Sequence, residues 1–171
     1  MASAEVLDFA KLLAPVSEAE PCGIDPRKDE SPSSLYYAVK FARRLASDQE
    51  RAAARPPDPS QPPPPPADWR PVSESAMKLL AHAKDLEVAA WLVEAQLRLN
   101  GFVGLRDGLR LLREYCEQYW DTLHPRHDET EGWFSRTAPL AGLNGDDAEG
   151  TLAAPLLRVL VTDGKGSGSF S

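Results

Sequence analysis

The sequence predicts an all-α protein, an antiparallel multi-helix bundle with a central buried helix and a long proline-rich loop. Three observations support this prediction. Apolar residues recur with a helical period along most of the chain, and only four residues, 159–162, resemble a strand. The segment 86–99 is apolar on nearly all sides, so neighbouring elements must cover it. Nine of the chain's 16 prolines fall between positions 56 and 71, which places a long loop there.

Two helices are expected before the proline-rich loop. The first is short and covers residues 4–13 after an N-cap at Ser3. The second is long and covers residues 34–55, and one side of it carries a cluster of apolar residues: Leu35, Val39, Ala42, Ala46 and Ala53. Four cations lie on the opposite side of this helix: Lys40, Arg44, Arg51 and Arg55. This cationic stripe either faces solvent or meets an acidic partner, for which region 121–150 of the chain itself is one candidate.

The proline-rich loop, residues 56–71, separates these two helices from the rest of the chain. Its unbroken proline run cannot donate backbone hydrogen bonds and favours an extended polyproline II path. We interpret it as a stiff surface loop, because an SH3-type ligand would carry a basic residue next to the prolines. Asp68 is expected to cap the following helix, residues 69–83, in which Pro71 is tolerated because the donors of the first turn have no helical partners.

The next helix, residues 86–99, is the predicted centre of the fold. Asp85 is placed to cap it, and its few polar residues occupy a narrow sector. Because apolar side chains fill most of the remaining surface, this helix must be covered on nearly all sides.

A second central helix is expected over residues 102–120, after a left-handed stop at Gly101. The turn between the two helices is very short, so they must run antiparallel. Gly104 and Gly108 lie one turn apart on the apolar side of the second helix. Glycine costs about 1 kcal/mol inside a helix, so we expect another backbone to pass close to both positions.

The composition excludes several classes of protein. The 171 residues contain 26 acids and 19 bases, a formal net charge of −7, which argues against nucleic acid or an anionic membrane as the main partner. No apolar run approaches the roughly 20 residues of a membrane span, and the N-terminus lacks a signal-peptide pattern. Cys22 and Cys116 lie far apart and are interpreted as reduced thiols of a cytosolic protein.

The acidity is concentrated in region 121–150, which carries seven acids and two bases. This region is interpreted either as a solvated loop or as a docking surface for a basic partner. The acidic members of the candidate interaction surface are Asp128, Glu129, Glu131, Asp146 and Asp147.

Sequence motifs for catalysis are weak. His124 and His127 form the only cluster of metal-ligand type, but their HxxH spacing is interrupted by Pro125, and zinc needs three or four converging ligands. We therefore predict no catalytic, cofactor-binding or metal-binding residue, and keep a metal-dependent hydrolase centred on the two histidines as the alternative. The Gly- and Ser-rich residues 164–171 are expected to begin a linker, so that residues 1–163 form one domain of a longer protein.

Several short motifs occur in a distinctive order. They include Asp68-Trp69, Lys84-Asp85-Leu86, Gly101-Phe102-x-Gly104-Leu105 and Tyr119-Trp120-Asp121-x-Leu123-His124-Pro125. Over residues 5–165 this order resembles the ImpA-type N-terminal domain of TssA proteins of the bacterial type VI secretion system.

The resemblance implies a function that periodicity alone does not reveal. It implies a cytoplasmic, non-enzymatic interaction module that acts at the baseplate, the contractile sheath and the tail tube, and that self-associates through a C-terminal region. It also implies that the motif residues determine the fold: Asp68, Trp69, Asp85, Trp91, Gly104, Gly108, Trp120, Asp121, His124 and Pro125. A generic helical scaffold unrelated to secretion is the remaining alternative.

Overall fold

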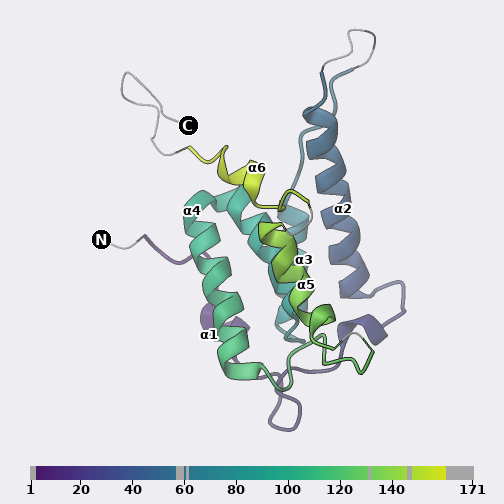
Figure 1. The fold of residues 1–171 in the computed structure, drawn as a ribbon, viewed down its shortest axis with the longest axis vertical. Helices are drawn as coiled ribbons and strands as arrows, with labels where there is room; N and C mark the ends of the chain where they lie inside the picture. Colours follow the sequence, from purple (N-terminus) through teal and green to yellow (C-terminus); the bar gives the residue numbers. More distant parts are fainter. Residues whose placement is uncertain (1–2, 57–59, 61, 131, 146–147, 161–171) are drawn as a thin grey trace.

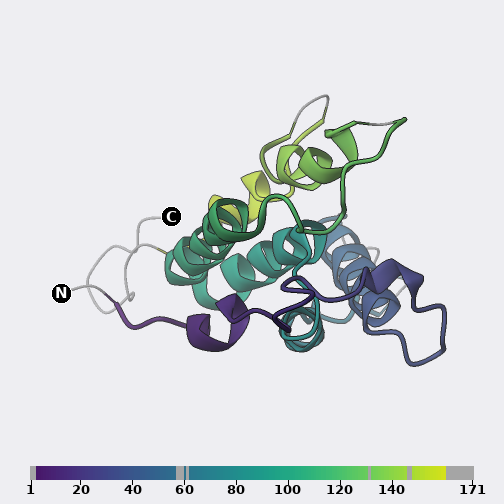
Figure 2. The same cartoon turned by 90° about the horizontal axis from the view of Figure 1, so that it is seen from below.

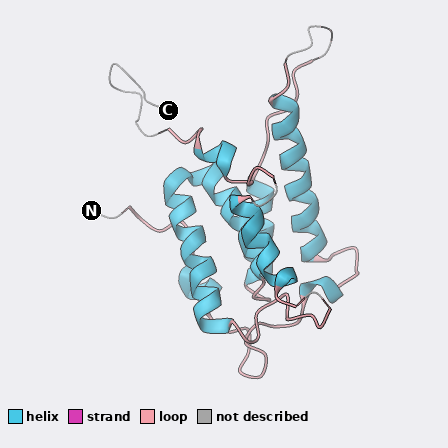
Figure 3. Cartoon of the chain, viewed as in Figure 1, coloured by secondary structure: helices cyan, strands magenta, loops and turns pink. Residues whose placement is uncertain are grey.

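A computed structural model describes residues 3–56, 60, 62–130, 132–145 and 148–160. The all-α prediction is confirmed: the described residues contain six α-helices, one short 3-10 helix and no strand (Figure 3). The elements in chain order are α1 Phe9–Leu13, η1 Pro26–Lys28, α2 Leu35–Ala53, α3 Arg70–Leu80, α4 Leu86–Tyr119, α5 Phe134–Asn144 and α6 Ala153–Leu156. None of the described helices has the length and apolar character needed to span a membrane.

Helix α4 is the centre of the molecule and consists of two helices that fold back on each other at Gly101. This glycine has φ 57° and ψ −139°, a left-handed conformation that interrupts the helix where the sequence predicts a stop. The two ends of α4 therefore meet, and the amide of Leu86 donates to the carbonyl of His124 at 2.7 Å. In the first half, every residue from Val88 to Leu97 is buried, as expected for a central helix. Figures 1 and 2 show α5 on one side of α4 and α1 on the other.

The close approach expected at the two glycines is present. A Cβ atom on Gly104 would lie 2.1 Å from the carbonyl oxygen of Gln96, and one on Gly108 would lie 2.9 Å from a methyl carbon of Val93. Distances this short are not tolerated by real Cβ atoms. The absence of side chains at these two positions therefore lets the second half of α4 lie against the first.

Two predicted helix starts are wrong. Helix α1 begins at Phe9, not at residue 4, and Asp8 caps it by accepting from the amide of Lys11 at 3.1 Å. The residues before it are held by α4 instead: the amide of Val6 donates to the Asp107 carboxylate at 2.6 Å. Helix α3 begins at Arg70, one residue later than predicted, because Asp68 binds the Arg70 amide at 3.0 Å in a local turn before the helix.

The predicted end of the third helix is also wrong. Helix α3 stops at Leu80, three residues before the expected end at 83. The chain leaves the helix there because it turns toward the N-terminal loop, where the amide of Lys84 donates to the carbonyl of Cys22 at 2.9 Å. Long-range backbone pairing thus ends a helix that the side-chain period alone would continue.

The acidic region contains a helix that sequence analysis did not predict. Helix α5 packs on α4, although Thr137, Pro139 and Gly142 are all poor helix formers. The proline-rich segment lies between α2 and α3 as expected, and its described residues are non-helical from 54 to 69. Positions 57–59 and 61, and the predicted linker 164–171, lie outside the described residues.

Candidate functional site

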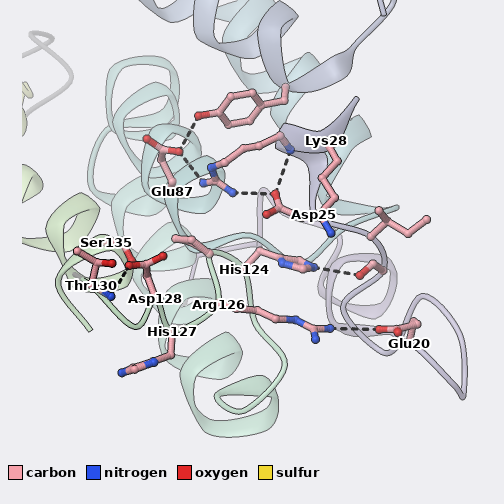
Figure 4. A pocket seen from close by; sticks show the side chains of 15 residues that line it. Glu20, Asp25, Lys28, Glu87, His124, Arg126, His127, Asp128, Thr130 and Ser135 are labelled. Carbon is pink, nitrogen blue, oxygen red and sulfur yellow. Dashed lines mark hydrogen bonds and ion pairs between the residues drawn. The ribbon is translucent and has the colours of Figure 1, made fainter. Parts of the chain in front are cut away.

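A polar cleft of about 1160 Å³ lies beside the start of α4 (Figure 4). Its walls come from the N-terminal loop around Gly23–Lys28, from α2, and from the segment that links α4 to α5. These parts are distant in sequence, so the cleft could not be recognised from spacing. The charged residues around it form the first candidate site.

Arg27 is the main cation of this cleft, and it forms ion pairs with three carboxylates. Its guanidinium lies 2.6 Å from the Asp85 carboxylate, 2.6 Å from that of Glu87 and 3.2 Å from that of Asp25. The Tyr36 hydroxyl also donates to Glu87 at 2.9 Å. The network ties the N-terminal loop, α2 and α4 together, and it leaves Arg27 engaged inside the chain.

The charged groups of this network stabilise one another and the start of α4. Asp85 is fully buried, and burial raises the pKa of its carboxyl, while the Arg27 guanidinium and the Val88 amide favour the charged form. Burial alone would lower the pKa of Arg27, but the carboxylates of Asp85 and Glu87 outweigh it and raise that pKa. The Asp85 carboxylate also caps α4, since it accepts from the Val88 amide at 2.9 Å. Asp85 thus both caps α4 and anchors the N-terminal loop through Arg27.

The two histidines of the HxxH motif have separate surroundings. The His124 ring is buried and its Nε2 lies 3.0 Å from the Gly23 carbonyl, whereas Nδ1 has no hydrogen-bond partner among the residues that the structure describes. His127 is exposed, packs edge-on against Trp133 at 4.7 Å between ring centroids, and points away from His124 in Figure 4. Among the described residues, no group of three or more His, Cys, Asp or Glu side chains could hold a metal ion.

The segment after α4 is held by Arg136 of α5. This arginine is 1% exposed, and its guanidinium donates to the carbonyls of Trp120 at 2.5 Å, Leu123 at 2.9 Å and Pro125 at 2.7 Å. The guanidinium carbon also lies 4.9 Å from the ring centroids of both Trp120 and Trp133, which stack on each other. Burial lowers the pKa of Arg136. In the sequence, Arg136 is only one of two bases in an acidic region, and this role was not predicted.

The remaining motif residues lie at packing positions or at turns. Trp69 is buried, donates from its indole to Glu50 at 2.9 Å, and has the Arg98 guanidinium 4.0 Å above its ring. Trp91 is buried beside Tyr36, with ring centroids 5.7 Å apart. Asp121 is exposed at the end of α4, and the His124-Pro125 peptide bond is cis.

Lys84 is a buried cation that sequence analysis did not single out. Its ammonium group donates to the carbonyl of Leu80 at 3.0 Å, at the C-terminal end of α3, and it lies near the buried thiol of Cys22. Burial lowers the pKa of Lys84 to about 8. The native state therefore loses this proton near pH 8, whereas the unfolded chain keeps it to about pH 10.5.

We expect the contribution of Lys84 to stability to rise with pH. Between pH 8 and 9 the unfolded state binds the proton that the native state has released, which adds about 1 kcal/mol to the free energy of unfolding. Burial raises the pKa of Cys22 and of Cys116, and these thiols act in the opposite sense near pH 9. Urea unfolding of the wild type and of Lys84→Met at pH 7, 8 and 9 isolates the lysine, because both thiols are common to the two proteins.

From pH 8 to 9, the free energy of unfolding of the wild type should rise by about 1 kcal/mol relative to that of Lys84→Met. The exposed Lys78 of α3 gives the control. Lys78→Met should follow the wild-type profile at every pH. Parallel profiles for the wild type and Lys84→Met would contradict the depressed pKa.

The structure places the predicted cationic stripe on the solvent side of α2. Lys40, Arg44, Arg51 and Arg55 are all exposed. Arg44 and Arg51 pair with Asp48 of the same helix, and none of the four makes an ion pair with the described part of 121–150. Asp128 and Glu129 are exposed in the segment before α5, whereas Glu131, Asp146 and Asp147 lie outside the described residues.

A row of exposed apolar side chains, which was not predicted, lies beside the cationic stripe. Tyr37, Phe41 and Leu45 follow one another at intervals of four residues along α2. Their spacing was a usable signal, because it sets them on the side of the helix opposite the buried Val39.

The fold is that of a small all-α domain organised around a folded-back helix pair. The chain belongs to the family described as ImpA, N-terminal, type VI secretion system, whose model matches residues 13–145. It is 35% identical over 155 residues to the type VI secretion system component TssA1 of Pseudomonas aeruginosa, a match that covers 91% of this chain and 40% of that protein.

The chain is also similar to a solved structure of a TssA component. The N-terminal domain of the TssA component from Burkholderia cenocepacia, which includes the conserved ImpA_N region, matches with a TM-score of 0.67 and 32% identity. The match covers 96% of this chain and 55% of that one. The chain thus spans about half or less of the length of both relatives.

Proposed function

We propose that this chain is a non-enzymatic protein–protein interaction module of a TssA-like assembly factor, acting in the bacterial cytoplasm at the baseplate, sheath and tail tube of a type VI secretion machine. Its membership of the ImpA N-terminal family carries the proposal, because the relatives are named as components of that machine. The cleft beside α4 supports it, since Arg27 is engaged by carboxylates of the chain itself.

The proposal assigns different roles to two sets of residues. The family-motif residues would maintain the fold, through packing at Trp69 and Trp91, close approach at Gly104 and Gly108, and the start of α4 at Asp85. Contacts with partners would use the cationic stripe of α2 or the acidic region.

Direct binding measurements test this function. We expect the purified chain to bind at least one individually purified baseplate, sheath or tube protein of its own secretion system in a saturable manner, as measured by biolayer interferometry. An unrelated acidic helical protein of similar size serves as the control. Failure of all three classes of component to bind would contradict the proposed function.

A further inference from the structure

The outer side of α2 carries large apolar side chains in solvent. Tyr37, Phe41 and Leu45 are 47%, 69% and 49% exposed. With 3.6 residues per turn, Phe41 lies about 200° around the helix from the fully buried Val39, so it points away from the bundle. Figures 1 and 2 show α2 at the edge of the molecule, with α3 along its inner side.

A second row, of cations, runs along one flank of these apolar side chains. It consists of the cationic stripe residues Lys40, Arg44, Arg51 and Arg55. On the helical wheel it lies about 70° from the apolar row. Among the described residues, Asp48 is the one carboxylate that forms ion pairs with this row, at 3.8 Å from Arg44 and 2.5 Å from Arg51. The face is therefore locally positive, although the chain as a whole has a net charge of −7.

These two rows define the chemistry of a partner. An apolar row with a residue every fourth position matches the apolar ridge of another amphipathic helix. Cations along one flank favour carboxylates on the matching flank of that helix, which would speed association and fix the register. We propose that the outer face of α2 is the docking surface for an amphipathic α-helix of a partner protein, with leucine-type residues on one face and glutamates or aspartates beside them.

Charge favours such a partner over a second copy of this chain. Two copies of α2 packed face to face in antiparallel orientation would place one cationic row beside the other. In parallel orientation each cationic row would face the flank that carries the uncharged Ala38 and Gln49. Neither arrangement supplies a row of carboxylates. The inference rests on the proposed function, because it specifies which surface of the interaction module binds and what it binds.

A peptide pair tests the chemistry of the site. The probe is a lactam-stapled helix of about 18 residues, long enough to span the rows, with leucines at intervals of four and glutamates along one flank. The control peptide has lysines in place of the glutamates. Titration calorimetry with the purified chain should show at least about tenfold tighter binding of the glutamate peptide.

Matched variants test the position of the site. Phe41→Asp should weaken binding of the glutamate peptide at least about tenfold, whereas the control Phe134→Asp on α5, at a residue that is 68% exposed, should leave it within about twofold. Arg44→Glu should weaken it severalfold, and Arg113→Glu on α4 should not. All four substitutions are at exposed positions, and circular dichroism checks that the helices are retained.

Several results would overturn the inference. They are equal binding of both peptides, no binding of either, an unchanged affinity after Phe41→Asp, or a concentration-dependent dimer in sedimentation that Phe41→Asp abolishes. If the chain binds a secretion component and Phe41→Asp does not weaken that binding, the docking surface is overturned and the proposed function stands. Specific peptide binding without capture of any component would sustain the surface and count against the proposed function.

Discussion

Replacing Gly104 with alanine is expected to destabilise the fold by about 3 kcal/mol, although alanine is the better helix former by about 1 kcal/mol. The reason is geometric. The added Cβ would lie 2.1 Å from the carbonyl oxygen of Gln96 and 2.6 Å from its carbon, and both are backbone atoms of the first half of α4. A backbone cannot rotate away as a side chain can, so the two halves of α4 must separate. Urea unfolding followed by far-ultraviolet circular dichroism measures the change.

Gly142 gives a control within the same protein. It also lies inside a helix, α5, but a Cβ there meets nothing within 4 Å. Gly142→Ala should leave stability unchanged or raise it by up to about 1 kcal/mol. Of the two glycine-to-alanine changes, only Gly104→Ala should therefore lower the free energy of unfolding. Stabilisation by both of them would mean that the halves of α4 do not touch at Gly104.

The helix pair at the centre of the fold could be predicted because its determinants are local. Residues 86–99 are apolar on nearly all sides, Gly101 follows them, and Gly104 and Gly108 are unfavourable in a helix unless a neighbour requires them. Each of these features is visible in sequence, and each has the expected counterpart in α4. Only the exact helix ends needed more information.

The features that were missed depend on contacts between distant segments. Helix α1 is shortened because Asp107, about a hundred residues away, binds the amide of Val6. Helix α5 has weak intrinsic propensity and is supported by packing on α4. The ion pairs of Arg27 with Asp85 and Glu87 join segments about 60 residues apart, and no spacing rule connects them.

One of the two rows on the outer face of α2 could be predicted from the sequence. The helical period correctly placed the cationic stripe on the exposed side of α2, because charged side chains avoid burial. The same period sets Phe41 on the exposed side, but large apolar residues are usually assigned to the core before their angle is considered. An apolar residue on the wrong side of a helix is therefore the more informative signal, since folding alone gives it no role.

Substitution of Arg136 is expected to have the other large effect, about 3 to 4 kcal/mol for Arg136→Met. Three carbonyls at the end of α4 receive their hydrogen bonds from this one guanidinium, those of Trp120, Leu123 and Pro125. Methionine fills a similar volume but leaves the three acceptors without these donors, and each unsatisfied buried group costs about 1–3 kcal/mol, partly offset because the charge is no longer buried. Urea unfolding measures the loss, and near-ultraviolet circular dichroism should report the changed packing of Trp120 against Trp133.

Arg136→Lys separates charge from geometry. Lysine keeps the positive charge, but its compact ammonium cannot take the place of a planar guanidinium that reaches three carbonyls and lies against two indole rings. We therefore expect a loss of about 2 kcal/mol even for this substitution. Arg126 of the same segment provides the control, because it is exposed and pairs with the exposed Glu20 at 3.3 Å. Arg126→Met should cost no more than about 0.5 kcal/mol. If Arg136→Lys cost as little as Arg126→Met, positive charge alone would suffice at position 136. The three hydrogen bonds of the guanidinium would then not be what holds α5 to the end of α4.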